Sequence, residues 1–470
     1  MKIAVVCSRE DFYYDIHALV KSFYPDSELV LMTEAEEAEK AAGCEARISV
    51  KIPDYDAEAG ERPEAKNQLK RELYRQLSAD TGLELPWGTL SGIRPTKIAM
   101  KAMREGKHED EIYRYMAETY LTSREKISLA MTVAGREKAL LDTLKPGWDL
   151  YVGIPFCPSI CSYCTFSSSP IGLWASSLDA YLAALEKELD AAVRWAAGRD
   201  DYPLHTIYIG GGTPTSLDPA HLDRLLAMIC GRFDAEAVSE FTVEAGRPDT
   251  VTPEKLKVLR SYPVTRISVN PQTMNDRTLE IIGRRHTAAQ TEAAFAMARR
   301  AGFDNINMDM ILGLPNEELP EVTATLDRIR ALGPESLTVH SLAMKRASRL
   351  TTAWEQYRSL SFHNSEQVMT LSRRAAEAMG MAPYYLYRQK NMKGNLENVG
   401  YAVPGRECLY NILIMEEFDS IMACGAGAST KAVTRAGTIR RVVNPKDVRT
   451  YLTHIDDLIE KKHEAGLWTF

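Results

Sequence analysis

The chain has 470 residues, of which 45% are hydrophobic and 26% are charged, and its formal net charge at pH 7 is -7. This length predicts two or three domains, or one large α/β barrel with additions, and the composition excludes a disordered or fibrous chain. The acidic balance argues against a nucleic-acid partner, and no apolar run approaches the ~20 residues of a membrane span. Because the N-terminus is a poor signal peptide, we expect a cytoplasmic protein without a membrane span.

The first part of the chain mixes strand and helix patterns. "MKIAVVC" and "ARISVKIP" predict two strands with a helix-like stretch between them, and residues 63–82 and 123–144 place apolar side chains at helical spacing. The stretch "LPWGTLSGIRPTK" predicts a turn and the start of a helix after Pro95. We therefore predict an N-terminal α+β domain of unknown role over residues 1–146.

A regular alternation of strands and helices begins near residue 147. Five helical stretches separate six short predicted strands, which lie at 149–154, 205–211, 240–245, 265–270, 305–312 and 336–342. Right-handed crossovers make such strands parallel. Residues 147–345 therefore predict an α/β unit, a partial (β/α)6 TIM-like barrel or an open doubly wound sheet. In both folds the chemistry lies at the carboxyl ends of the strands.

The alternation ends after residue 345. A helix at 365–380 and a strand at 384–390 are predicted there, followed by a loop-rich stretch and a closing helix from about Pro445. We predict a C-terminal α+β extension over 346–470 that covers the substrate.

Three of the eight cysteines lie within eight residues, directly after the first strand of the predicted barrel: Cys157, Cys161 and Cys164. Their Cys-x3-Cys-x2-Cys spacing suits an iron–sulfur cluster with three protein ligands and one open iron. A zinc site completed by a remote residue such as His205 is the alternative. The isolated cysteines are expected to be small buried apolar residues: Cys7, Cys44, Cys230, Cys408 and Cys424.

Polar and glycine-rich features follow the other strands of the predicted barrel. "GGGTP" comes after the second strand, Glu244 ends the third, Gln272 follows the fourth and Asp309 lies near the end of the fifth. Because the carboxyl ends of parallel strands meet at one end of a barrel, this pattern predicts a binding site there.

The cysteine segment "YVGIPFCPSICSYCTF" and "IYIGGGTPTSL" resemble the radical S-adenosylmethionine (SAM) superfamily. The match extends to the oxygen-independent coproporphyrinogen III oxidase (coproporphyrinogen dehydrogenase) family, through "RISVNPQTMNDRTLEIIGRRHT" and "INMDMILGLPNE". Within it, "LSGIRPTK" and the "GYAVPGRECLYNI" tail are most similar to the HemZ-like branch. The resemblance implies a radical SAM barrel whose cofactors are a [4Fe-4S] cluster and SAM.

The same resemblance implies roles for individual residues. The cluster ligands are Cys157, Cys161 and Cys164. Tyr151 is the candidate catalytic residue and lies beside SAM. The residues implied to contact the methionine part of SAM are Gly211, Gly212 and Thr213; those implied to contact its ribose or carboxylate are Glu244, Gln272, Arg284 and Asp309; and Ala343 is implied to lie near the adenine.

The activity that the resemblance implies is oxidative decarboxylation of two coproporphyrinogen III propionates to vinyl groups in haem biosynthesis. Its partners are a tetrapyrrole substrate and a reduced flavodoxin or ferredoxin-type electron donor. A haem-binding chaperone of the same family and a radical SAM enzyme for another substrate are the alternatives.

Three features of the chain depart from the family. Gly153 replaces a common His, and Thr165 stands where the oxidases proper have a further cysteine. Residues 395–415 contain no His or Trp, unlike the element that marks the chaperones, which leaves Cys408 as a conceivable haem ligand.

Overall fold

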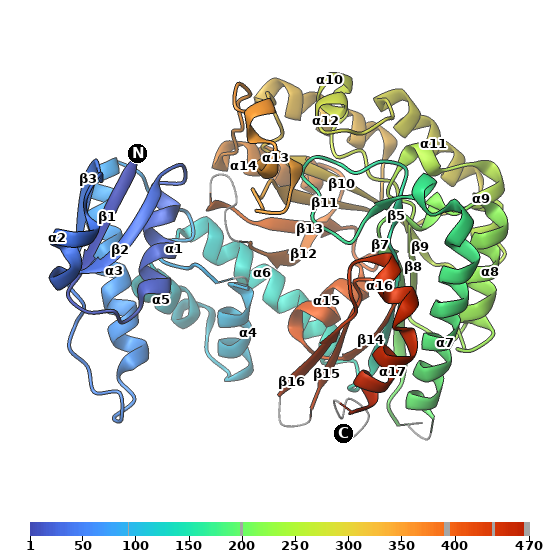
Figure 1. Ribbon diagram of the computed structural model, residues 1–470, viewed down its shortest axis with the longest axis horizontal. Coiled ribbons are helices and arrows are strands. Elements are labelled where there is room, and N and C mark those ends of the chain that lie inside the picture. Colours follow the sequence, from blue (N-terminus) through green and yellow to red (C-terminus); the bar gives the residue numbers. More distant parts are fainter. Residues whose placement is uncertain (93, 198–200, 390–394, 435–437, 465–470) are drawn as a thin grey trace. The chain divides into compact units, whose positions relative to one another are not determined.

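The computed structural model describes residues 1–92, 94–197, 201–389, 395–434 and 438–464 (Figure 1). The chain forms two compact units, one of Met1–Gly135 with Leu386–Glu397 and one of Arg136–Tyr385 with Asn398–Phe470. The predicted functional domains, 1–146, 147–345 and 346–470, stay a prediction.

The first unit contains a small parallel sheet in the order β2-β1-β3. Its strands are β1 (Lys2–Cys7), β2 (Glu28–Thr33) and β3 (Ala46–Val50). Buried side chains of the sheet pack against α1 (Tyr13–Phe23) and α3 (Arg62–Thr81) in one apolar core. The sequence did not predict β2, because only Met32 of that strand is fully buried and the pattern is weak. The following helices are α4 (Thr96–Arg104), α5 (Glu109–Tyr120) and α6 (Arg124–Leu141).

Six consecutive parallel strands form the centre of the second unit, as predicted. They pair in chain order and are β4 (Trp148–Ile154), β7 (Leu204–Gly211), β8 (Glu240–Glu244), β9 (Arg266–Ser268), β10 (Ile306–Leu312) and β11 (Ser336–Ser341). The connecting helices cover them in Figure 1 and are α7 (Leu178–Ala196), α8 (Pro219–Cys230), α9 (Pro253–Arg260), α11 (Ala288–Arg300) and α12 (Leu319–Leu332). The prediction of a partial (β/α)6 barrel is therefore confirmed.

The C-terminal part adds strands to both edges of this core. On one side β13 (Asn398–Ala402) pairs antiparallel with β11, and β12 (Ala382–Tyr387) follows it; the predicted end of this strand, Lys390, lies outside the described residues. On the other side β14 (Ser420–Cys424) pairs parallel with β4 and is followed by β15 (Ser429–Val433) and β16 (Ile439–Val443). The prediction of a loop-rich stretch before the closing helix was wrong, because this part forms strands and α15; glycines such as Gly425 and Gly427 interrupt the strand pattern in the sequence.

The remaining helices of the second unit include α10 (Asp276–Ile281), which the sequence did not predict. The others are α13 (Arg349–Thr352), α14 (Glu366–Ala378), α15 (Leu409–Glu416), α16 (Val448–Thr453) and α17 (Ile455–Glu464). In the described part of the chain, no helix combines the length and apolar character that crossing a membrane requires.

Candidate active site

The core strands are almost entirely buried, and their few half-buried residues mark the candidate site. β4, β8, β10 and β11 each have one such residue, and these are Tyr151, Glu244, Asp309 and His340. Parallel strands that are covered by helices bury both faces, so an accessible polar side chain in each one indicates a shared interior space. All four residues lie in the carboxyl halves or at the middle of their strands, where barrel enzymes place their chemistry.

Glu244 accepts a hydrogen bond from a tyrosine on the neighbouring strand β7. Tyr208 Oη donates a 2.6 Å hydrogen bond to Glu244 Oε1, and the Tyr208 ring stacks on Tyr410 of α15 at 4.5 Å and on Tyr151 at 6.1 Å. Burial, with a smaller contribution from the negative charge of Asp309, raises the pKa of Glu244 to about 7. The Glu244 carboxyl group therefore changes its protonation near neutral pH.

The surroundings of Asp309 favour its ionised form, in contrast to those of Glu244. Asn270 Nδ2 donates to Asp309 Oδ2 at 2.8 Å, Asn307 Nδ2 donates to Oδ1 at 2.6 Å, and His340 Nε2 lies 3.9 Å from Oδ2. Burial opposes ionisation, but the interaction with His340 and the hydrogen bond from Asn307 outweigh it and lower the pKa of Asp309. One acid that is partly protonated and one that is ionised therefore share the site.

Gln272 and Arg284 supply polar groups that lack partners within the described residues. Gln272 is buried with a left-handed φ of 64°, and its Oε1 accepts no hydrogen bond there. Arg284 donates from Nη1 to Asn270 O at 2.8 Å and from Nη2 to Tyr163 Oη at 3.2 Å, whereas its Nε is unpaired. Backbone strain and unsatisfied buried atoms are costly, and they are typical of a binding site.

The three clustered cysteines lie on a loop that begins at β5 (Phe156–Cys157) and closes at β6 (Ser169–Pro170), and all are free thiols. Arg247 is buried and donates to Ser159 O at 3.2 Å and to Cys161 Sγ at 3.7 Å. The guanidinium group of Arg284 also interacts electrostatically with Cys161. Two guanidinium groups therefore face the middle cysteine.

The glycine-rich turn after β7 is joined to the cysteine segment. Gly212 N donates to Ile154 O at 2.8 Å, Thr213 N donates to Phe156 O at 2.7 Å, and Thr213 Oγ1 lies 3.4 Å from Cys157 Sγ. Gly211 has a φ of 102°, and a Cβ on Gly212 would lie 2.7 Å from Phe156 O. These glycines are therefore required for packing on the cysteine segment.

The structure brings together most of the predicted site residues but not all. Ala343 lies two positions beyond β11, and its role near the adenine stays a prediction. The zinc alternative through His205 is wrong: His205 lies at the amino end of β7, away from the cysteine loop, with Nδ1 2.6 Å from Asp419 Oδ2. Cys408 is fully buried, and its Sγ donates to Glu240 Oε1 at 3.3 Å at the amino end of β8.

Of the other isolated cysteines, Cys7 and Cys424 are fully buried as predicted, whereas Cys44 and Cys230 are only half-buried.

The turn after β14 packs closely against the backbone of Gly153. A Cβ atom on Gly425 in this turn would lie 2.3 Å from Gly153 O. The departure of Gly153 from the family pattern therefore coincides with a close backbone contact.

The sequence analysis missed four residues of this site: Tyr208, Arg247, Asn270 and His340. Arg247 follows Glu244 by three residues, and Asn270 ends the fourth predicted strand. The strand-end rule that selected Glu244 and Asp309 also applies to these two positions.

The residues present fit a cluster with three cysteine ligands and a bound amino-acid-like cofactor. Three thiols offer the donor set, and Arg247 and Arg284 offset negative charge beside Cys161. Gln272 Oε1 offers an unused acceptor. Among the described residues, no three His, Cys, Asp or Glu side chains are grouped so that they could hold one metal ion, so the ligand assignment stays a prediction.

Comparison with known proteins identifies the family. The model of the Radical SAM superfamily matches residues 151–329. The oxygen-independent coproporphyrinogen-III oxidase-like protein HemZ of Bacillus subtilis (strain 168) is 41% identical over 404 residues, which are 85% of this chain and 80% of that protein. The chain belongs to the HemZ-like branch of the radical SAM superfamily. This superfamily uses a [4Fe-4S] cluster and SAM, so the predicted cofactors are confirmed.

Two further matches place this HemZ-like protein among its relatives. The heme chaperone HemW of the same Bacillus strain is 40% identical over 196 residues, which are 42% of this chain and 50% of that protein. The structure of coproporphyrinogen III oxidase (HemN) from Escherichia coli matches with a TM-score of 0.53 and 22% identity, covering 68% of this chain and 72% of that one. The match to HemN shows a shared fold.

Proposed function

We propose that this HemZ-like protein is an oxidoreductase that cleaves SAM reductively and acts on a tetrapyrrole, with the propionates of coproporphyrinogen III as the reacting groups. The observation that carries the proposal is the convergence of the cysteine loop, two buried guanidinium groups, one partly protonated acid and one ionised acid in the barrel. The long match to a protein named coproporphyrinogen-III oxidase-like supports the substrate class. When bound, the cluster and SAM supply the one-electron cleavage that starts the reaction.

The residues of the chain position the cofactor in this proposal. Asp309 is ionised and suits ribose hydroxyl groups as an acceptor, while Arg284 suits a carboxylate. Gln272 Oε1 accepts no hydrogen bond from the described residues and can therefore accept one from an ammonium group. Tyr151 faces the same space from β4 and stacks on Tyr208, which fixes its ring.

A haem chaperone is the second candidate, because the relatives include proteins named heme chaperone HemW. Cys408 does not favour it. The Cys408 side chain is fully buried and bonded to Glu240 at the amino end of the barrel, so it could ligate haem only if α15 moved.

One anaerobic assay separates these functions. The full chain is reconstituted with iron and sulfide and incubated with SAM, dithionite and coproporphyrinogen III, and 5′-deoxyadenosine and protoporphyrinogen are quantified. We expect both products. Absence of 5′-deoxyadenosine would overturn the enzyme assignment, and 5′-deoxyadenosine without protoporphyrinogen would overturn the substrate. Stoichiometric haem binding with neither product would favour the chaperone.

We expect SAM binding to strengthen as the pH rises from about 6 to about 8, by up to about tenfold per pH unit below the pKa of Glu244. Protonated Glu244 accepts fewer hydrogen bonds than its carboxylate, whose two oxygens can both accept from ribose hydroxyl groups that donate to them. Burial raises this pKa most, Asp309 raises it further, and Tyr208 and Arg266 lower it from the neighbouring strands. Anaerobic titration calorimetry measures the affinity, and Glu244→Gln is expected to lose the dependence. An equal pH dependence in that variant would contradict the role of Glu244.

A further inference from the structure

Arg247 is a buried cation beside the cysteine loop whose role the proposed function leaves open. It lies three positions beyond Glu244, the last residue of β8, and is 2% exposed. A guanidinium group carries five N–H donors, and burying it costs free energy unless the donors meet acceptors and the charge is balanced. The partners of Arg247 therefore indicate its role.

The guanidinium group of Arg247 makes five hydrogen bonds, one for each of its N–H donors. Nε and Nη2 each donate to one oxygen of Asp249 at 2.9 Å. Nη2 also donates to Ser159 Oγ at 3.2 Å, and Nη1 donates to Ser159 O at 3.2 Å and to Cys161 Sγ at 3.7 Å. Two donors thus bind the guanidinium group to Asp249, and the other three go to the segment that ends at Cys161.

Asp249 anchors this guanidinium group from the same loop. It lies in the short turn η5 (Pro248–Thr250), two residues beyond Arg247, and its side chain is 16% exposed. Burial opposes ionisation of Asp249, but the hydrogen bonds and the charge of Arg247 outweigh it and lower the pKa of the carboxyl group. The two residues therefore form a bidentate ion pair at neutral pH, which fixes the plane of the guanidinium group.

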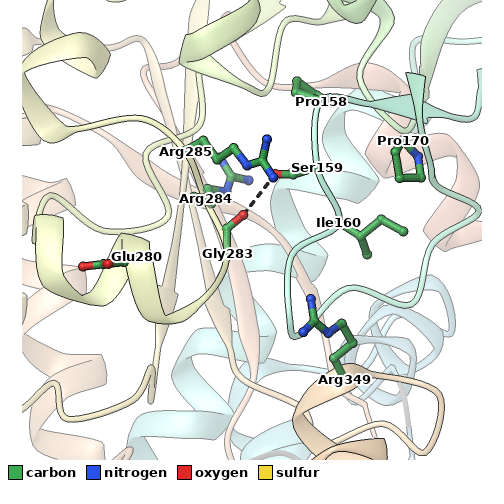
Figure 2. Close-up of a pocket in the computed structure, with 9 residues that line it drawn as sticks. All are labelled: Pro158, Ser159, Ile160, Pro170, Glu280, Gly283, Arg284, Arg285 and Arg349. Carbon is green, nitrogen blue, oxygen red and sulfur yellow. Dashed lines mark hydrogen bonds between the residues drawn. The ribbon is translucent and has the colours of Figure 1, made fainter. Parts of the chain in front are cut away.

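The segment that Arg247 contacts is the link between the first two cysteines of the loop. Residues 158–160 make up this whole link, and they form one wall of the recess drawn in Figure 2. Ser159 Oγ, which accepts from Arg247, donates in turn to Gly283 O at 3.0 Å, the bond marked in Figure 2. Arg247 and the turn at Gly283 therefore fix the same residue, and with it the approach of the chain to Cys161.

A hydrogen bond to a ligand sulfur changes how readily an iron–sulfur cluster accepts an electron. Reduction adds one negative charge to the cluster and its thiolates, and a donor or a positive charge beside a sulfur stabilises the more negative state. Arg247 supplies both at Cys161, in a buried position where screening by water is weak. Because Asp249 offsets part of the charge, we expect the hydrogen bond to Sγ to carry most of the effect.

We propose that Arg247 is a positioning residue for the iron–sulfur cluster, which together with Asp249 fixes the segment before Cys161 and, through Nη1, raises the reduction potential of the bound cluster. This inference goes beyond the proposed function, because it requires a cluster on the predicted cysteines but neither SAM cleavage nor a tetrapyrrole. Arg247 gains and loses no electron or proton; the electron comes from an external one-electron reductant.

The first test is a redox titration of the reconstituted full chain, with a mediated electrode as the electron source and visible absorbance and electron paramagnetic resonance as readouts. In Arg247→Gln we expect the one-electron reduction constant to fall about tenfold or more, which lowers the midpoint potential by about 59 mV. Arg247→Lys keeps the charge but not the planar fork, so at least half of that shift should remain. The matched control is Arg232→Gln, which removes a guanidinium group bound to carboxylates of α7 outside the cysteine loop, and it should leave the midpoint unchanged.

A second measurement uses the same full chain before iron is added. Ser162 N donates to Ile282 O at 2.9 Å and Cys164 N donates to Cys161 O at 3.1 Å, so the exchange of these two amide hydrogens with deuterium reports the order of the loop. We expect both to exchange about tenfold faster or more in Arg247→Gln, because the link before Cys161 loses three hydrogen bonds. The control variant should exchange at the wild-type rate.

The possible outcomes decide the proposal. A loaded Arg247→Gln chain whose reduction constant stays within about twofold of the wild-type value would overturn it, and so would a wild-type midpoint in Arg247→Lys. If Arg247→Gln takes up no cluster, the amide exchange decides: an unchanged loop, or an equal rise of exchange in α8, overturns the proposal. A wild-type chain whose cluster titrates but that forms no 5′-deoxyadenosine would overturn the proposed function, whereas the comparison of midpoints would still decide the role of Arg247.

Discussion

Replacing Cys161 with Ser is expected to abolish the brown absorbance of the reconstituted protein and to slow 5′-deoxyadenosine formation by at least about 100-fold. Cys161 is the middle cysteine of the loop, is 8% exposed, and faces the guanidinium groups of Arg247 and Arg284. A serine hydroxyl fills the same space but is not a thiolate donor, so only two cysteines would remain for the cluster. Visible absorbance, iron content and product formation measure the effect.

The matched control for this variant is Cys230→Ser. Cys230 is half-buried at the end of α8 and lies outside the cysteine loop. The Cys230→Ser protein should keep the wild-type iron content and the wild-type rate of 5′-deoxyadenosine formation. A Cys161→Ser protein with wild-type iron and absorbance would refute the ligand assignment, whereas equal losses in both variants would indicate a general effect of removing a thiol.

The barrel could be predicted from the sequence because its signals are local. Strands such as β4 and β10 are buried on both faces, so they read as short apolar runs, and each is followed by a helix of ordinary length. The strand-end rule then selected Glu244, which ends β8, and Gln272, which follows β9, whereas Asp309 lies at the middle of β10 and not near its end. Each of these predictions depended on chain order alone.

The parts that could not be predicted depend on distant contacts. Asn270 and His340 have no distinguishing local pattern, and their place beside Asp309 follows from the pairing of separate strands. Strands β13 to β16 were missed because the glycines between them obscure the alternation. The positions of Gly425 and Gly427 make sense only when their neighbours Gly153 and Ser167 are known.

Glu188 is a clear case of a residue whose role the sequence conceals. It lies in α7, where a charged residue is expected to face solvent, yet it is 2% exposed. Its carboxylate accepts hydrogen bonds from Asn444 Nδ2 at 2.8 Å, from Gly425 N at 2.7 Å and from Tyr451 Oη at 2.7 Å, and it pairs with Lys462. Lys462, which is 1% exposed, also donates to Ala423 O. One carboxylate therefore joins α16, α17 and the turn that covers Gly153.

We expect Glu188→Ala to lower the free energy of unfolding by about 3–5 kcal/mol, because it leaves the buried Lys462 ammonium without its counter-charge. Urea unfolding followed by tryptophan fluorescence measures the loss. The control is Glu186→Ala on the same helix, whose partly exposed pairing with Arg232 should contribute no more than about 1 kcal/mol. The double variant Glu188→Gln/Lys462→Met should recover part of the stability, since it removes both charges together. Glu188 holds Gly425 through the hydrogen bond from Gly425 N, and Gly425 packs on Gly153 in β4, the strand that leads into the cysteine loop. Glu188→Ala should therefore also retain less iron after reconstitution. Equal unfolding energies for Glu188→Ala and Glu186→Ala would show that this buried network does not stabilise the fold.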